Sequence, residues 1–121
     1  METQDSEPAA AQFINYSDFE KVNLRVGQIL EAERVEKADK LLRLQVNLGE
    51  KLGKRQILAG IAKSFAPEQL IGRKVVVVTN LEPRSLRGHL SEGMLLAAVD
   101  EQDNLTLVSP GDESPAGAIV R

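Results

Sequence analysis

Residues 74–100 read KVVVVTNLEPRSLRGHLSEGMLLAAVD, and this stretch decides the predicted fold. It contains two apolar runs, 75–78 and 94–99, separated by turn formers. Such runs are typical of strands buried on both faces. Four consecutive valines favour a strand over a helix because their side chains are β-branched. We therefore predict two central strands that present a basic loop, with Arg84 and Arg87, beside the working face.

The composition excludes several classes of function. The 121 residues fit one domain, with no cysteine and one histidine, His89. A disulfide framework, a thiolate metal site and a histidine-cluster site are therefore excluded, and we expect no metal and no cofactor. No apolar run approaches the roughly 20 residues of a membrane span, and the N-terminus lacks a signal-peptide pattern. These absences predict a cytoplasmic protein with no membrane partner.

The formal net charge of −3 hides an uneven distribution. Residues 1–20 carry five acids and no base, and residues 100–121 carry five acids and one base. Residues 21–99 carry 14 bases and 8 acids, a net charge of +6. A basic body between acidic ends is compatible with a polyanionic partner or with ordinary solvated surface charge, although the overall pI of about 5.2 argues against the polyanion.

Alternating apolar and polar residues predict a long half-buried strand over 22–33 and another over 42–48. Gly27 predicts a bulge or bend inside the first strand, and Ser17 is the expected cap of a preceding helical turn. The remaining predicted elements are a strand over 56–62, a short helix over 66–72, a strand over 105–108 and an edge strand over 118–120.

This order of elements predicts an all-β fold, a five-stranded OB-fold barrel with one short helix and N- and C-terminal extensions. Another small barrel or a sandwich is the alternative. Residues 1–16 are expected to form a flexible acidic tail, and residues 17–121 the domain. The exposed apolar residues expected near the start of the domain, and the sheet edges of a small barrel, predict a homodimer.

Five motifs occur in order along residues 18–121: D-F-x-K-V-x-L-R-V-G, K-A-D-K-L, G-I-A-K, N-L-x-P-R and S-x-G-M. This pattern resembles the tRNA-binding domain at the C-terminus of many methionyl-tRNA synthetases and in free-standing structure-specific tRNA-binding proteins. The resemblance implies a dimeric OB barrel that binds tRNA by shape, alone or in trans with methionyl-tRNA synthetase. A related export-associated chaperone shares the dimeric barrel, so peptide binding is the alternative, and a synthetase-associated adaptor is a third class.

No catalytic constellation or phosphate-cradling glycine loop is visible, so we expect a binding module and not an enzyme. Guanidinium groups grip phosphates, and Arg25 and Arg43 fall on the polar parity of adjacent predicted strands, where they could share one face. Each base taken singly is compatible with plain solvated charge. The candidate RNA contacts are Arg25, Lys40, Arg43, Lys63, Asn80, Arg84, Arg87, Ser91 and Met94.

The resemblance implies roles for Ser91 and Met94, which match family positions associated with tRNA binding. Gly93 between them allows a bulge that would bring both to one face. The alternative for Met94 is core packing, and for Asn80 it is capping of the turn before Pro83. Glu92 departs from the glutamine common in the family, and an acid beside RNA weakens binding.

The chain has three phenylalanines and one tyrosine, and only Phe65 lies after residue 20. Single-strand binders on OB folds use several stacked aromatic side chains. Recognition of folded RNA through its backbone and 2′-hydroxyls fits this composition better. Phe13, Ile14, Tyr16 and Phe19 are predicted to form the apolar patch of the homodimer.

Overall fold

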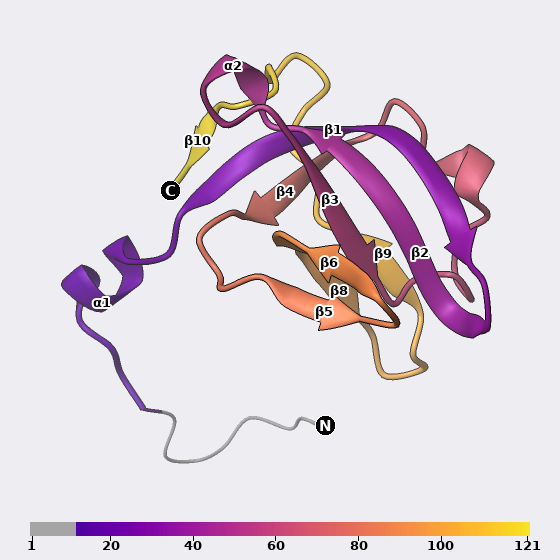
Figure 1. Cartoon of the computed structure of the whole chain (residues 1–121). Coiled ribbons are helices and arrows are strands. Elements are labelled where there is room, and N and C mark those ends of the chain that lie inside the picture. Colours follow the sequence, from indigo (N-terminus) through magenta and orange to yellow (C-terminus); the bar gives the residue numbers. More distant parts are fainter. Residues whose placement is uncertain (1–11) are drawn as a thin grey trace.

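The computed structural model describes residues 12–121, and most of the expected tail, residues 1–11, lies outside the described residues. Within that range the chain forms ten strands and three short helical segments (Figure 1). The helical segments are α1 (Tyr16–Glu20), α2 (Gly49–Leu52) and the 3-10 turn η1 (Pro67–Gln69). The strands are β1 (Leu24–Val35), β2 (Ala38–Asn47), β3 (Lys54–Ala59), β4 (Lys74–Val78), β5 (Arg84–Leu86), β6 (His89–Ser91), β7 (Met94–Leu95), β8 (Ala97–Val99), β9 (Leu105–Leu107) and β10 (Ile119–Val120). None of the helices in residues 12–121 is long and apolar enough to cross a membrane.

The main sheet has six strands, and its pairings are antiparallel. Its order is β3-β2-β1-β4-β7, with β10 paired to the start of β1, while β5–β6 and β8–β9 form separate hairpins. The ladder does not continue from β7 to β3. Hydrogen bonds still join these edges, among them those from Glu92 N to Gln56 O (2.8 Å) and from Leu58 N to the Ser91 hydroxyl (3.0 Å). The all-β prediction is confirmed, with more and shorter strands than expected.

The main core is built from one face of each long strand. Leu42, Leu44 and Val46 alternate along β2 and are fully buried, and the polar residues between them are partly exposed. In β4 all four valines are at most 5% exposed, and Val75 and Val77 belong to the main core cluster. The half-buried strand predicted over 42–48 and the central strand predicted over 75–78 are therefore confirmed.

β1 does not alternate as predicted, because its register shifts between Ile29 and Glu31 and not at Gly27. Ile29 is fully buried, where the sequence pattern predicted Leu30. Gly27 is needed for a different reason: a Cβ at this position would lie 2.6 Å from Val46 Cγ1, so only glycine lets β1 and β2 pack this closely. The extra residue reverses the faces of β1 beyond the shift.

The segment after β4 departs from the prediction in two places. Residues 84–91 form the β5–β6 hairpin where a loop was predicted, and its turn lies at Arg87 (φ 51°) and Gly88 (φ 83°). A two-residue type I′ turn requires positive φ at both positions. The second apolar run is two strands, because the Leu96 N–H donates to Val76 O and its carbonyl accepts from Val108 N. Leu96 is thus the residue at which the chain stops pairing with β4 and begins to pair with β9. Residues 97–99 are exposed.

The helical segments and strand ends also differ from the prediction. Asn15 caps α1, since its Oδ1 accepts from Asp18 N (2.9 Å), and the Ser17 hydroxyl donates to the same oxygen (2.7 Å). Residues 66–72 contain only the 3-10 turn η1, and β3 ends at Ala59 before a bend at Gly60. The edge strand predicted over 118–120 is present as β10.

Candidate nucleic-acid interface

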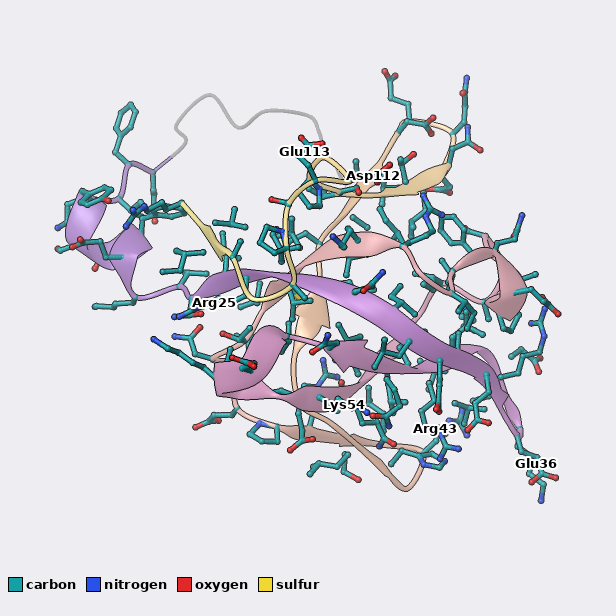
Figure 2. All side chains as sticks on the ribbon, turned by 90° about the horizontal axis from the view of Figure 1, so that it is seen from above. Arg25, Glu36, Arg43, Lys54, Asp112 and Glu113 are labelled. Atoms are coloured by element: carbon teal, nitrogen blue, oxygen red, sulfur yellow. The ribbon has the colours of Figure 1, made fainter. Side chains whose placement is uncertain are left out.

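The structure places Arg25 and Arg43, the two arginines predicted to share one face, toward opposite ends of β1. Arg25 lies at the start of β1 opposite Val77, whereas Arg43 lies on β2 opposite Glu33, eight residues further along. At about 3.3 Å per strand residue, this separates them by about 26 Å, and Figure 2 shows them well apart. The register shift between them also reverses the faces. The prediction that Arg25 and Arg43 share one face is therefore wrong.

Two regions follow from this arrangement. The terminal end comprises α1, the start of β1, the end of β4, and β10. The tip end comprises the β1–β2 turn, the β5–β6 turn and the chain that follows β3 (Figure 1). Arg25 and Asn80 belong to the terminal end. Lys40, Lys63 and Arg87 belong to the tip end.

At the terminal end, the predicted polar residues are engaged within the fold. Arg25 Nη1 donates to Gly117 O (3.0 Å), and its Nε donates to Asn23 Oδ1 (3.3 Å). Asn80 Oδ1 accepts from Asn23 N (2.9 Å), and its Nδ2 donates to Lys21 O (2.6 Å). Backbone N–H and C=O groups that have no hydrogen-bond partner in a neighbouring strand need one from a side chain such as these. Arg25 and Asn80 therefore hold the two terminal segments against β1 and β4.

Ser91 and Met94 have opposite environments. Ser91 is 6% exposed, and its hydroxyl accepts from Leu58 N (3.0 Å) and donates to Gly93 O (3.3 Å). Its only hydrogen is already used inside the fold, so the predicted donation to RNA does not fit this geometry. Met94 is 46% exposed on β7 opposite Val78. Its side chain is thus open to a ligand and is not a core side chain.

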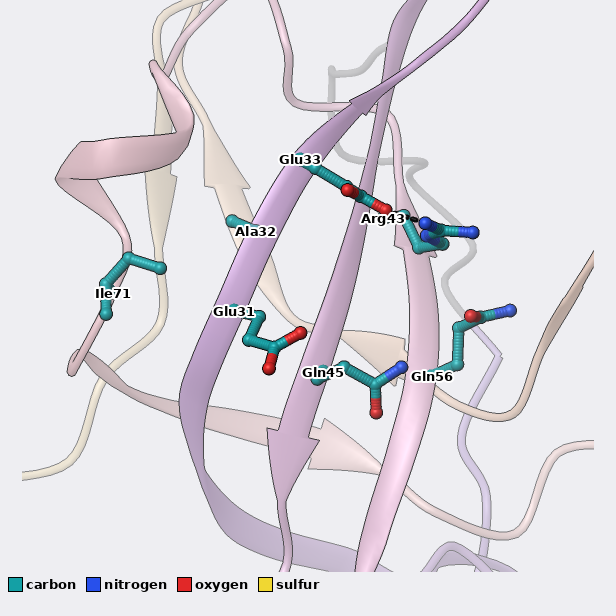
Figure 3. Close-up of a pocket in the computed structure, with 7 residues that line it drawn as sticks. All are labelled: Glu31, Ala32, Glu33, Arg43, Gln45, Gln56 and Ile71. Atoms are coloured by element: carbon teal, nitrogen blue, oxygen red, sulfur yellow. Dashed lines mark ion pairs between the residues drawn. The ribbon is translucent and has the colours of Figure 1, made fainter.

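The outer face of β1, β2 and β3 carries a groove of about 530 Å³ (Figure 3). Glu31, Gln45 and Gln56 form one cross-strand row along it. In the next row Glu33 forms an ion pair with Arg43. The groove thus has two carboxylates and one engaged guanidinium, a combination that offers hydrogen bonds but repels phosphate.

Arg43 also approaches His89, the only histidine, with 3.3 Å between Arg43 Nη1 and His89 Nδ1. A guanidinium has no acceptor, so Nδ1 must accept here, which assigns the ring proton to Nε2 in the neutral imidazole. The contact joins β2 to β6. Arg43 is therefore a cross-strand connector as well as a surface cation.

The tip end holds a second hollow, of about 430 Å³, between the β1–β2 turn and the β5–β6 turn. Three cations and one acid line it, together with two apolar residues. The lining residues are Lys37, Ala38, Asp39, Lys40, Leu41 and Arg87. Lys63 is exposed next to this region, since Ala62 N donates to Lys40 O (3.0 Å), and Arg84 is exposed at the base of β5. The structure thus brings Lys40, Lys63 and Arg87 to one end.

Two basic residues outside the predicted site have clear roles. Lys37 lines the tip hollow with positive φ (64°), and its place within the polar E-K-A-D-K turn was the only available signal. Arg55 donates from Nη1 to Thr79 O (2.6 Å) and to Glu92 O (3.4 Å). It joins β3 to the ends of the central strands, a long-range role that no local pattern indicates.

The terminal end also exposes the apolar residues that the sequence placed there. Phe13, Ile14 and Tyr16 are 99%, 66% and 66% exposed, and Phe19 is 38% exposed. Ile119 of β10, 58% exposed, borders the same region, where a small hollow of about 190 Å³ is lined by residues of α1, β1 and β10. We call these five residues the terminal apolar patch. Exposed apolar residues gathered at one end of a molecule are typical of protein interaction sites.

The β8–β9 turn is acidic, in contrast to the β5–β6 hairpin, which carries Arg84 and Arg87. The Asp100 carboxylate accepts from Asn104 Nδ2 (3.0 Å), Asn104 N (2.9 Å) and Gln102 N (2.8 Å). The Asn104 side chain, followed by the two backbone amides, lowers the pKa of Asp100 from its ordinary value of 3.8. This hairpin thus carries a fixed negative charge.

Comparison with known proteins gives a consistent result. A family model described as "Putative tRNA binding domain" matches residues 24–119. The chain is 50% identical over 113 residues to a methionine–tRNA ligase of Helicobacter pylori, covering 93% of this chain and 17% of the ligase. It is 54% identical over 108 residues to the ligase of Methanothrix thermoacetophila, covering 89% and 16%. The chain therefore spans about a sixth of the length of these relatives.

Two solved structures match nearly the whole described fold. A MetRS-related protein from Pyrococcus horikoshii superposes with a TM-score of 0.86 at 34% identity, covering 92% of this chain and 100% of that chain. The chaperone CsaA from Bacillus anthracis superposes with a TM-score of 0.82 at 34% identity, covering 91% and 100%. Both neighbours are thus similar to this chain from end to end.

Proposed function

The chain belongs to the tRNA-binding domain family, and from this membership we propose that it binds folded tRNA through its backbone, largely without reading sequence. The family match over residues 24–119 carries the proposal. The net charge of +6 on residues 21–99 supports it, because phosphate contacts supply most of the affinity for a nucleic acid. The role is binding without catalysis, in a domain formed by residues 17–121.

We propose that the β-strands form a five-stranded OB barrel. Hydrogen bonds from Glu92 and Leu58 bring β3 against the segment before β7, and η1 falls between β3 and β4, where an OB barrel carries its helix. The aromatic residues support recognition by shape. Phe65 packs against the core with the Arg73 guanidinium 5.4 Å from its ring centroid, so it is not a free stacking surface.

The exposed candidates are the proposed RNA contacts. They are Lys40, Lys63, Arg84 and Arg87, with Met94 packing its thioether against a base or ribose. Arg43 contributes positive charge beside them despite its ion pair with Glu33. Arg25, Asn80 and Ser91 are not proposed as direct contacts, because their polar atoms are engaged in hydrogen bonds within the fold.

We also propose a homodimer through the terminal apolar patch, working in the cytoplasm alone or in trans with methionyl-tRNA synthetase. The patch is exposed without a covering element within residues 12–121. Light scattering should give a dimer mass at micromolar concentration. Deleting residues 1–20 should reduce the dimer and deleting residues 1–11 should not. A monomer mass for the full chain would remove the dimer from the proposal.

A gel-shift comparison tests the proposed function directly. Total tRNA should shift the protein at lower concentration than single-stranded oligonucleotides of equal length, because the latter lack the folded shape. An unfolded protein substrate should remain unprotected from aggregation. Protection of that substrate without a tRNA shift would favour the peptide-binding chaperone, the function named for the Bacillus anthracis neighbour.

A further inference from the structure

The hollow at the tip end has the features of a built anion site. Its volume of about 430 Å³ lies within the range of about 300–1,000 Å³ typical of small-molecule sites. Lys37 and Lys40 reach it from one hairpin and Arg87 from the other. Asp39 is the only acid in its lining, so the lining carries a net charge of +2.

The backbone fixes both tips that carry these cations. Lys37 has φ 64° and Arg87 has φ 51°, so each residue occupies the left-handed conformation that a tight turn needs. Beneath the hollow, Val35 and Ala38 pack with Leu58 in a second apolar cluster, and Leu41 and Leu86 pack against that cluster. Since these residues come from both hairpins and β3, the cluster holds the two tips at a set separation.

The cations of the hollow also remain available. Neither Lys37, Lys40 nor Arg87 makes an ion pair with any residue of the range 12–121. Arg43, by contrast, is ion-paired with Glu33 on the neighbouring face. Charges that converge on one hollow without a counter-ion among residues 12–121 attract an anion, and a guanidinium opposite two ammonium groups can hold a phosphate from two sides.

We propose that the two hairpin tips clamp a single backbone phosphate of the bound RNA, with Arg87 on one side and Lys37 and Lys40 on the other. This inference rests on the proposed function, and it names the site where the RNA backbone is held. The half-buried Leu41 in the lining offers an apolar surface to the attached ribose. The Asp39 carboxylate repels the phosphate and so limits the affinity of the hollow for it.

Asparagine substitutions test the clamp without straining the turns. Asparagine tolerates positive φ, and Asn before Gly88 is a preferred type I′ pair. Lys37→Asn and Arg87→Asn should therefore keep or raise the melting temperature. Each should weaken tRNA binding about two- to fivefold, the range for one partly exposed charge contact. Lys51→Asn on α2, exposed and distant from the hollow, is the matched control and should leave binding unchanged.

The salt dependence of the triple variant decides whether the phosphate is shared. With one phosphate held by the three cations, Lys37→Asn/Lys40→Asn/Arg87→Asn should lower the log–log salt slope by about 0.7–0.9. A drop of about 1.4–1.8 would mean two separate phosphates, and no drop would mean none; either result overturns the clamp. Wild-type protein that fails to bind tRNA would overturn the proposed function instead.

Removing the 5′-terminal phosphate of the tRNA separates the two possible sources of the anion. A backbone phosphate predicts unchanged affinity for dephosphorylated tRNA. Inorganic phosphate at matched ionic strength should likewise compete no better than chloride. A loss of affinity on dephosphorylation equal to that of Arg87→Asn would assign the hollow to the terminal phosphate and overturn the clamp.

Discussion

The two ends of β1 use their polar side chains in different ways. At the terminal end, Arg25 and Asn80 bond to the carbonyls of Gly117 and Lys21, so they are engaged in holding chain segments. At the tip end, the cations around the hollow have no ion pair within residues 12–121. Arg25 is engaged because the backbone carbonyl of Gly117 needs a donor, whereas no such demand is made on the cations of the hollow within residues 12–121.

Ser91→Ala should have the largest effect and tests whether an engaged polar group acts on stability alone. It leaves the buried Leu58 N–H without its acceptor, which costs about 1–3 kcal/mol of unfolding free energy. Urea denaturation measures the loss, and Ser85→Ala, at an exposed position of β5, is the control. The folded variant should bind tRNA normally. Unchanged stability together with weakened binding would contradict this, because it would mean that Ser91 contacts the RNA and does not support the fold.

Arg25→Ala tests whether the arginine at the terminal end supports the fold without contacting RNA. Loss of the bond to Gly117 O should lower stability by about 1 kcal/mol. The salt slope of tRNA binding should not change, because this arginine holds backbone and not phosphate. Thermal melts and a salt titration measure the two quantities, with Lys51→Ala as the surface control. A slope lowered by about 0.7–0.9 would show that Arg25 also neutralises a phosphate.

Met94→Ala tests a proposed RNA contact at the terminal end, where Met94 lies opposite Val78 at the end of β4. Because Met94 is 46% exposed, its truncation should cost less than about 1 kcal/mol, well below the about 2–5 kcal/mol of a core methionine. Binding should weaken if the thioether packs on the RNA. Leu90→Ala, 48% exposed on β6, is the matched control. Full affinity in the folded variant would leave the terminal end without a proposed RNA contact.

Asp100→Asn should have the smallest effect and concerns the acidic turn. The folded-state pKa of Asp100 lies below its ordinary value of 3.8, so folding favours the ionised form. Its contribution to stability is therefore present above the unfolded pKa and is lost as pH falls through the folded pKa. The difference in melting temperature between the variant and the wild type should shrink from pH 7 to pH 3. Glu101→Gln in the same turn is the control, and a pH-independent difference would contradict the assignment.

The sequence was informative where one physical rule acted alone. The alternation of residues 42–48 and the valines of β4 predicted buried strands, because burial alone sets those patterns. The parity of β1 failed at Ile29, since an extra residue in a strand leaves no mark in its composition. The β5–β6 hairpin was missed because Arg87, and not asparagine, occupies the first left-handed position of its turn.

The candidate site was less predictable than the fold for a similar reason. Ser91 matches a family position associated with tRNA binding, yet its hydroxyl satisfies a backbone group of β3, a strand more than 30 residues earlier. Lys37 was passed over because a lysine in a polar turn has no distinguishing local feature. Lys37 shares a hollow with Arg87 only because the β5–β6 turn packs close to the β1–β2 turn. That packing joins segments distant in sequence.

The acidic loop between β9 and β10, which carries Asp112 and Glu113, has a consequence for how a polyanion approaches the molecule. Asp112 and Glu113 lie on the opposite side of β1 from Arg43 and Lys54, so these two acids and these two bases face opposite sides of the fold (Figure 2). Such a separation exerts a torque on an approaching polyanion over about one Debye length, about 8 Å at physiological salt. Diffusing RNA is thereby turned toward the basic side before contact, which raises the association rate and leaves the lifetime of the complex unchanged.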